Sequence, residues 1–110
     1  MKGFKLVAAF VAGGAVAVLA AAAYGGQHTI TEKGKVFSES EITIKTGDTV
    51  VFVNDDVVAH NVLSTAPENS FNLGLLAPGT STPVTFNTAG EIPIICAIHP
   101  SMKMVVKVVN

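Results

Sequence analysis

Residues 41–53 read EITIKTGDTVVFV, and this segment decides the fold class. Polar and apolar residues alternate over residues 41–45, which is typical of a strand with one buried face. Gly47 and Asp48 indicate a turn. The β-branched and aromatic run at residues 49–53 then predicts a strand in the interior of a sheet. A strand, a short turn and a second strand are therefore the starting point for interpreting the rest of the chain.

Further strand-like segments, separated by turn residues, continue on both sides of this pair. Residues 65–79 are mostly loop, and no segment after residue 23 shows a helical period, so the sequence predicts an all-β fold: an antiparallel Greek-key β-sandwich of roughly seven or eight strands. Pro93 predicts that its strand lies at an edge or begins irregularly. The additional candidate strands are residues 28–37 (two strands around Gly34), 59–64, 80–87, 92–96 and 104–109.

The first 23 residues have the pattern of a cleavable signal peptide. Lys2 and Lys5 precede an apolar run, and residues 21–23 supply an Ala-x-Ala cleavage pattern. The alternative is a retained membrane anchor, because residues 6–23 approach the length that spans a bilayer. The run is rich in Ala and Gly, which favours cleavage. We therefore expect residues 1–23 to be removed and residues 24–110 to form one domain that is periplasmic or otherwise exported, with membrane attachment only if the leader is retained.

The composition of the remaining domain limits its partners. With Lys2 and Lys5 removed, five lysines, no arginine and eight acidic residues remain, for a formal net charge of −3. Phosphate binding needs a basic surface, so nucleic acid is excluded as a partner. Cys96 is the only cysteine, so no internal disulfide forms, and a lone cysteine in an exported protein pairs with another chain, stays a free thiol or binds a metal.

Residues 96–104, CAIHPSMKM, place a thiolate, an imidazole and two thioethers in one loop between apolar strands. Thiolate and thioether are soft ligands that favour Cu(I), and imidazole suits copper in both oxidation states. A site of two histidines, one cysteine and a long axial methionine is associated with electron transfer. The loop supplies only His99, so we expect the second imidazole to come from His60, at the start of a candidate strand.

The two parts of this pattern resemble a known family. His60-Asn61-Val62, a long gap and then Cys-x-x-His-Pro-x-Met are similar to the small blue copper proteins, the cupredoxins, especially the plastocyanin, amicyanin and pseudoazurin group. Residues 45–50 (KTGDTV) and 75–80 (LLAPGT) also match, and the resemblance extends from about Ile30 to Asn110.

The resemblance implies one copper ion, cycling between Cu(I) and Cu(II), held by His60 Nδ1, Cys96 Sγ and His99 Nδ1, with Asn61 bracing the Cys96 loop. Met102 and Met104 both qualify as the axial ligand. Pro100 looks like the shorter, amicyanin-type loop, which favours Met102, and Met104 shares the face of its strand with core positions.

The leading functional hypothesis is a one-electron carrier, not an enzyme: an exported monomer whose redox partner proteins dock near His99. Copper storage or delivery without redox turnover is the alternative. A zinc site and a nucleophilic Cys96 are less favoured, the latter because no oxyanion-hole motif is visible. His28 is interpreted as solvated or structural, and Asp55 and Asp56 as turn residues. The hydrophobic residues Leu73, Leu75 and Leu76 fit either the core or an apolar patch around the copper.

Overall fold

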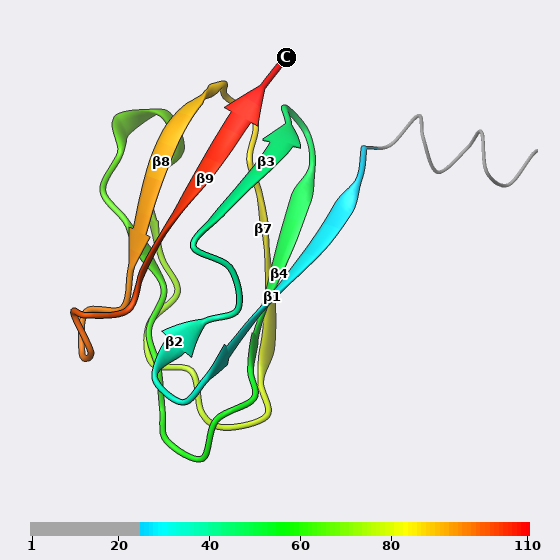
Figure 1. Ribbon diagram of the computed structural model, residues 1–110. Helices are drawn as coiled ribbons and strands as arrows, with labels where there is room; N and C mark the ends of the chain where they lie inside the picture. Colours follow the sequence, from blue (N-terminus) through cyan, green and yellow to red (C-terminus); the bar gives the residue numbers. More distant parts are fainter. Residues whose placement is uncertain (1–24) are drawn as a thin grey trace, which may run out of the picture.

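The computed structural model describes residues 25–110, so the predicted signal peptide and its cleavage site lie outside the described residues. This part of the chain forms two β-sheets packed face to face, which confirms the predicted β-sandwich (Figure 1). Its one helix is the short 3₁₀ turn η1 (Pro67–Asn69), and no helix between residues 25 and 110 is long and apolar enough to cross a membrane. The strands are β1 (Gln27–Lys33), β2 (Val36–Phe37), β3 (Glu41–Lys45), β4 (Thr49–Asn54), β5 (Leu63–Ser64), β6 (Phe71–Asn72), β7 (Ser81–Thr85), β8 (Gly90–Ile95) and β9 (Lys103–Val109).

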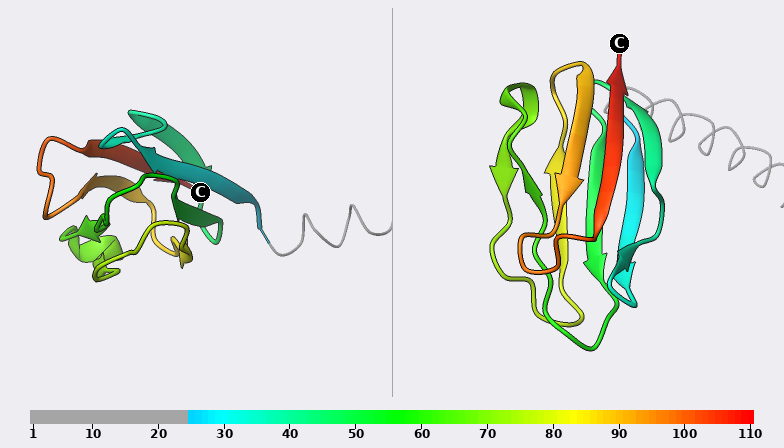
Figure 2. Two further views of the ribbon diagram at one scale, coloured as in Figure 1. Left: turned by 90° about the horizontal axis from the view of Figure 1, so that it is seen from below. Right: turned by 60° about the vertical axis from the view of Figure 1, so that its left-hand side comes forward.

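One sheet has the order β2-β1-β4-β7 and the other the order β3-β9-β8-β5-β6. In the right-hand view of Figure 2, β8 and β9 of the second sheet lie in front of the strands of the first. Each sheet contains one parallel pair, β1 with β4 and β3 with β9, so the expectation of purely antiparallel pairing is corrected. β1 is parallel to β4 because the chain leaves the first sheet after β2, passes through β3 in the other sheet and enters β4 at the end of the sandwich where β1 begins.

The core lies between the two sheets and follows the alternation seen in the sequence. In β4, Val50, Phe52 and Asn54 face inward, and in β9 the inward residues are Met104, Val106 and Val108. Phe86, directly after β7, is fully buried and meets the ring of Phe71 edge to face, at 5.9 Å between ring centroids. Burying such aromatic side chains supplies much of the hydrophobic stabilisation that a domain of this size needs.

Pro93 lies in β8, which is an interior strand of its sheet but has no strand paired with it on one side at Pro93. β8 pairs with β9 along its whole length, whereas β5 pairs with β8 only through Leu63 and Ile95. Pro93 therefore has a strand partner on one side alone. This arrangement tolerates its missing N–H and explains how a proline fits here.

The candidate strand at residues 59–64 is shorter than expected. Only Leu63 and Ser64 form β5, and His60 makes an isolated antiparallel bridge to Leu76. The reason is the path of the chain, since residues 55–62 cross from β4 in one sheet to β5 in the other. A crossing segment cannot stay in register with either sheet, so His60 is held by two backbone hydrogen bonds to Leu76, of 3.0 and 2.7 Å.

Asp48 ties together the end of the sandwich at which β1 begins. Its carboxylate accepts hydrogen bonds from the backbone N–H groups of Gly26 and Lys45, and the ring of His28 lies 2.9 Å from it. These donors, first Lys45, then Gly26 and then His28, lower the pKa of Asp48 from 3.8 to about 2. The ionised carboxylate thus fastens the start of β1 to the β3–β4 turn.

Asp48→Ala should destabilise the fold by about 2 kcal/mol at pH 7, because three donors lose a charged acceptor. Since the folded-state pKa lies below the ordinary value, this stabilisation is present above pH 3.8 and is lost as the pH falls toward 2. Urea unfolding of both proteins between pH 2 and 7 measures the difference. Glu41→Gln, which removes an exposed pair with Lys107, is the control and should change stability little. A deficit that stays constant down to pH 2 would contradict the assignment.

Candidate metal centre

Three side chains from separate segments converge at one end of the sandwich. His60 comes from the crossing segment between β4 and β5, Cys96 directly follows β8, and His99 lies in the loop before β9. Figure 1 shows the β8–β9 loop at the end of the molecule opposite the C-terminus. Within residues 25–110 these three form the one group of His, Cys, Asp or Glu side chains whose ligand atoms are close enough to share an ion, all within 4.8 Å of one another.

The donor atoms face one another. His60 Nδ1 and His99 Nδ1 are 3.2 Å apart, and His99 Nδ1 is 3.8 Å from Cys96 Sγ. A first-row ion about 2.05 Å from each imidazole nitrogen and about 2.3 Å from a thiolate would separate trigonal ligands by about 3.6 Å (N to N) and about 3.8 Å (N to S). The observed spacing therefore fits one ion between these atoms with little rearrangement.

The outer nitrogen of His60 is fixed by a carboxylate. His60 Nε2 lies 2.9 Å from Asp56 Oδ2, and the pKa of Asp56 is lowered from 3.8 to about 2, first by this hydrogen bond and then by the backbone N–H groups of Lys35 and Val57. An ionised carboxylate only accepts, so Nε2 carries the proton. In the neutral ring Nδ1 then keeps its lone pair, which points toward Cys96 and His99.

Asn61 connects the crossing segment to the cysteine loop. Its backbone N–H donates to Cys96 Sγ at 3.2 Å, and its side-chain Oδ1 accepts from the N–H of Ala97 at 3.0 Å. The amide Nδ2 donates to Asn72 Oδ1 and to the carbonyl of Gly74. These contacts are the brace that the resemblance implied, and they set the position of the sulfur from outside its own loop.

The donor set suits copper. The His60 imidazole with an unprotonated Nδ1, the His99 imidazole and one thiol that accepts a backbone hydrogen bond match the chemistry of Cu(I) and Cu(II). His60 and Cys96 are fully buried, which excludes water from two of the three ligands, whereas His99 is half-buried.

Both candidate axial methionines are buried, in different settings. Met102 closes the loop, because its N–H donates to the carbonyl of His99 and its carbonyl accepts from the N–H of Cys96. Met104 pairs with Ile94 in the β8–β9 ladder and faces the core. Met102 thus shares a hydrogen-bonded turn with two of the three converging residues, whereas Met104 lies in a strand.

Comparison with known proteins decides the family. The profile of the copper binding proteins of the plastocyanin/azurin family matches residues 25–110. The chain belongs to this family. Its cofactor is accordingly one copper ion, which the geometry above accommodates.

Individual relatives agree with the family assignment. An amicyanin from Paracoccus versutus is 36% identical over 57% of this chain and 50% of its own length, and amicyanin-alpha from Methylorubrum extorquens is 33% identical over 94% of this chain and 87% of its own. A solved structure of a reduced amicyanin mutant superposes with a TM-score of 0.70 at 26% identity, covering 76% of this chain and 82% of that one. The chain spans only about half the length of the Paracoccus protein.

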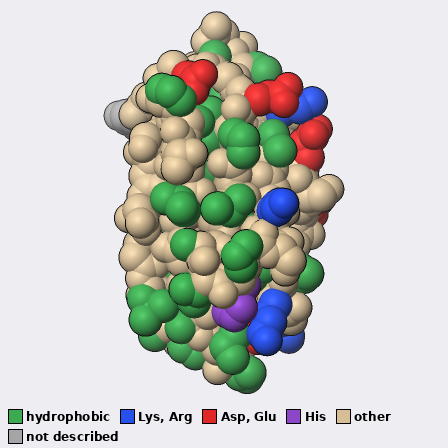
Figure 3. Space-filling model, turned by 90° about the vertical axis from the view of Figure 1, so that its left-hand side faces the viewer, with side chains coloured by type: hydrophobic (Ala, Val, Ile, Leu, Met, Phe, Trp, Pro, Cys, Tyr) green, Lys and Arg blue, Asp and Glu red, His purple; other side chains and the backbone are tan. Residues whose placement is uncertain are grey.

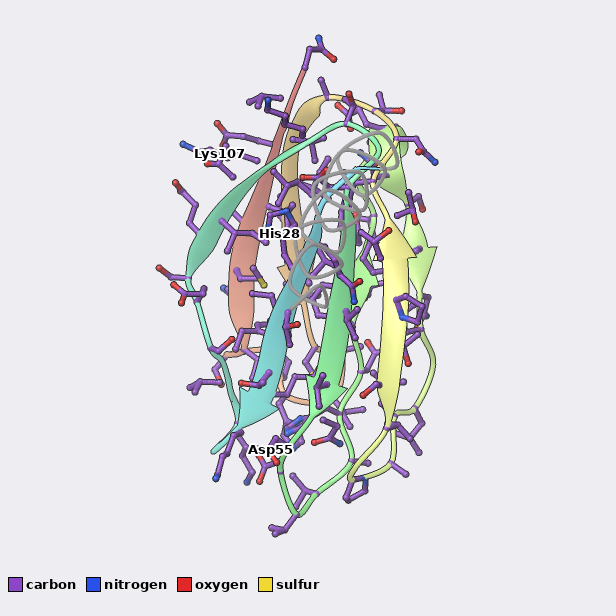
Figure 4. All side chains as sticks on the ribbon, turned by 90° about the vertical axis from the view of Figure 1, so that its right-hand side faces the viewer. His28, Asp55 and Lys107 are labelled. Atoms are coloured by element: carbon purple, nitrogen blue, oxygen red, sulfur yellow. The ribbon has the colours of Figure 1, made fainter. Side chains whose placement is uncertain are left out.

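The third histidine of this family member takes no part in the cluster. His28 pairs with Asp48 and lies well away from Asp55, which begins the crossing segment directly after β4 (Figure 4). The interpretation of His28 as structural agrees with this position. Asp55 is an exposed turn residue, as expected, whereas Asp56 also bonds to His60. The available signal for this contact was that Asp56 precedes His60 by four residues.

Glu32 is a buried carboxyl group that sequence reasoning missed. It follows Ile30 on the inward face of β1, it is fully buried, and neither side-chain oxygen has a hydrogen-bond partner. Burial raises its pKa above 4.5, and the nearby His60 lowers the pKa by less than burial raises it. The inward position, two residues after Ile30, was the available signal, because strand residues two apart share a face.

Glu32→Gln should stabilise the copper-free protein increasingly as the pH rises. A raised folded-state pKa means that the neutral acid contributes fully below pH 4.5 and that this contribution is lost as the pH rises through the folded-state pKa. Glutamine stays neutral, so we expect a gain on the order of 1 kcal/mol at pH 8 and little change at pH 4. Thermal unfolding at both values measures it, with the exposed Glu39→Gln as control. A variant less stable than the parent at pH 8 would show that the ionised side chain is needed.

Proposed function

We propose that this protein is an exported type 1 copper protein that carries one electron at a time between redox partner proteins. In this proposal His60, Cys96 and His99 would hold the copper, Met102 would be the fourth ligand, and no residue is catalytic. The bound copper supplies the Cu(I)/Cu(II) couple, and the protein supplies its position and its surroundings.

The observation that carries this proposal is the convergence of two Nδ1 atoms and one Sγ at ligand spacing. Electron transfer is fast when the ligands barely move between the two oxidation states. Two features restrain them here: the carboxylate on His60 Nε2 and the Asn61 contacts to the cysteine loop. Ligands held by contacts outside the metal site need little reorganisation when the charge of the copper changes.

The surface near His99 supports docking of a partner protein. Ile98 next to it is 48% exposed, and Leu75, in the segment leading to the His60–Leu76 bridge, is 71% exposed. Figure 3 shows a histidine near one end of the molecule with hydrophobic side chains around it and lysines beside it. An apolar patch of this kind suits brief contact with a second protein, and half-buried His99 offers the electron a path to the surface.

A spectroscopic titration tests the function. Protein purified without copper should take up one equivalent of Cu(II), develop an intense visible band and an EPR signal, lose both with ascorbate and regain them with ferricyanide. Protein that binds Cu(I), stays colourless and resists oxidation would instead indicate copper storage or delivery. N-terminal sequencing of protein from the periplasmic fraction tests export and the expected cleavage after Ala23.

Cys96→Ala should abolish the visible band, because the band requires the copper–thiolate bond. Met102→Leu should keep the colour and raise the reduction potential, since loss of a thioether destabilises Cu(II) relative to Cu(I). Met104→Leu is the matched control, because it makes the same change at the strand position two residues away. Cyclic voltammetry of the three proteins decides, and a potential shifted only in Met104→Leu would reverse the axial assignment.

A further inference from the structure

The contact with Asp56 gives the His60 imidazole a hydrogen-bond partner that the His99 imidazole does not have among the described residues. His60 is completely buried and its Nε2 lies 2.9 Å from an ionised carboxylate whose side chain is 11% exposed. For His99, in contrast, the only hydrogen-bond contacts of its ring within the described residues are those of Nδ1 with His60 and Cys96. The two imidazoles thus have the same donor atom and different electrostatic surroundings.

The carboxylate itself is held rigidly. Asp56 Oδ2 also accepts from the backbone N–H of Lys35 in the β1–β2 turn, Oδ1 accepts from the N–H of Val57, and the N–H of Asp56 donates to Asn54 Oδ1. Asn54, at the end of β4, is buried and anchored in turn to the carbonyls of Val58 and Leu76. Asp56 therefore cannot rotate away without breaking contacts to both neighbouring segments.

We propose that Asp56 is a positioning residue that fixes the tautomer and orientation of His60 and, through its charge, lowers the reduction potential of the copper. This inference rests on the proposed function for its second half only. A carboxylate bonded to the outer N–H makes an imidazole a more basic ligand. Basic, electron-rich ligands favour Cu(II) over Cu(I). At a buried ring this charge is weakly screened, so it acts more strongly than a surface charge would.

The chain offers a matched pair of variants. Asp56→Asn removes one negative charge, yet its amide oxygen can stay where Oδ2 stands and keep the bonds to His60 and Lys35, losing only the bond from Val57, which is 88% exposed. Asp55→Asn removes the same charge from the neighbouring residue, whose carboxylate is 62% exposed and 3.9 Å from Lys33. Asp56→Ala removes both the charge and the hydrogen bond.

The first measurement uses the copper-free protein, so it does not depend on copper binding. Long-range ¹H–¹⁵N NMR at pH 8, where an ordinary histidine is neutral, should show the proton of His60 on Nε2 in the parent, Asp55→Asn and Asp56→Asn proteins. Asp56→Ala should populate the other tautomer. A proton on Nδ1 in the parent protein, or an unchanged tautomer in Asp56→Ala, would overturn the positioning role.

The second measurement is the reduction potential of the copper-loaded proteins. Asp56→Asn should change the ratio of Cu(II) to Cu(I) affinity about tenfold in favour of Cu(I), an upward shift of about 59 mV for a one-electron couple. Asp55→Asn should change it less than twofold. Equal shifts in the two variants, or none in Asp56→Asn, would overturn the role of the charge. A parent protein with no copper–thiolate band would refute the proposed function. The NMR measurement would still decide whether Asp56 positions His60, because it uses the copper-free protein.

Discussion

Asn61 holds together two segments that no strand pairing would bring into register. The crossing segment belongs to neither sheet, and the cysteine loop lies beyond the end of β8. The side chain and the backbone N–H of Asn61 reach the loop at Ala97 and Cys96, while its Nδ2 donates to Asn72 in β6 and to Gly74 just after β6. Without these bonds the thiol would be placed only by its own loop. Bonds from the residue next to His60 thus hold the thiol beside the crossing segment.

A layered set of constraints surrounds that brace. Asn54, the last residue of β4, bonds to the backbone of Asp56 and to the carbonyl of Leu76. Asp56 in turn bonds to His60 Nε2, and His60 Nδ1 faces the other two ligands. Each polar group in this series is buried or nearly so and has its partner. A buried polar network that is fully satisfied favours one arrangement of its members. The position of His60 is thus fixed, through Asp56 and Asn54, by the end of β4.

The sequence predicted the parts of the structure that depend on local pattern. Alternation located β3, β7 and β9, a continuous β-branched and aromatic run located β4, and the two-part histidine and cysteine motif identified the three residues that converge. What it missed depends on contacts between distant segments. The parallel pairing of β1 with β4 leaves no trace in either strand's own sequence. Asp56 was interpreted as an ordinary turn residue, because its partner His60 lies four residues later in a segment without regular structure. Glu32 was missed because the strand that contains it was predicted from its apolar residues.

The pairing of β3 with β9 has a consequence for how the chain reaches this state. Glu41 lies beside Val105, more than sixty positions later, so this sheet is completed only when the final strand arrives. Contacts between such distant positions are slow to form, because the intervening chain must first be ordered. The loop that carries Cys96 is closed by the pairing of β8 with β9, and in the folded chain the thiol is fully buried. Burial of the thiol is therefore a property of the assembled sheet and not of its loop alone.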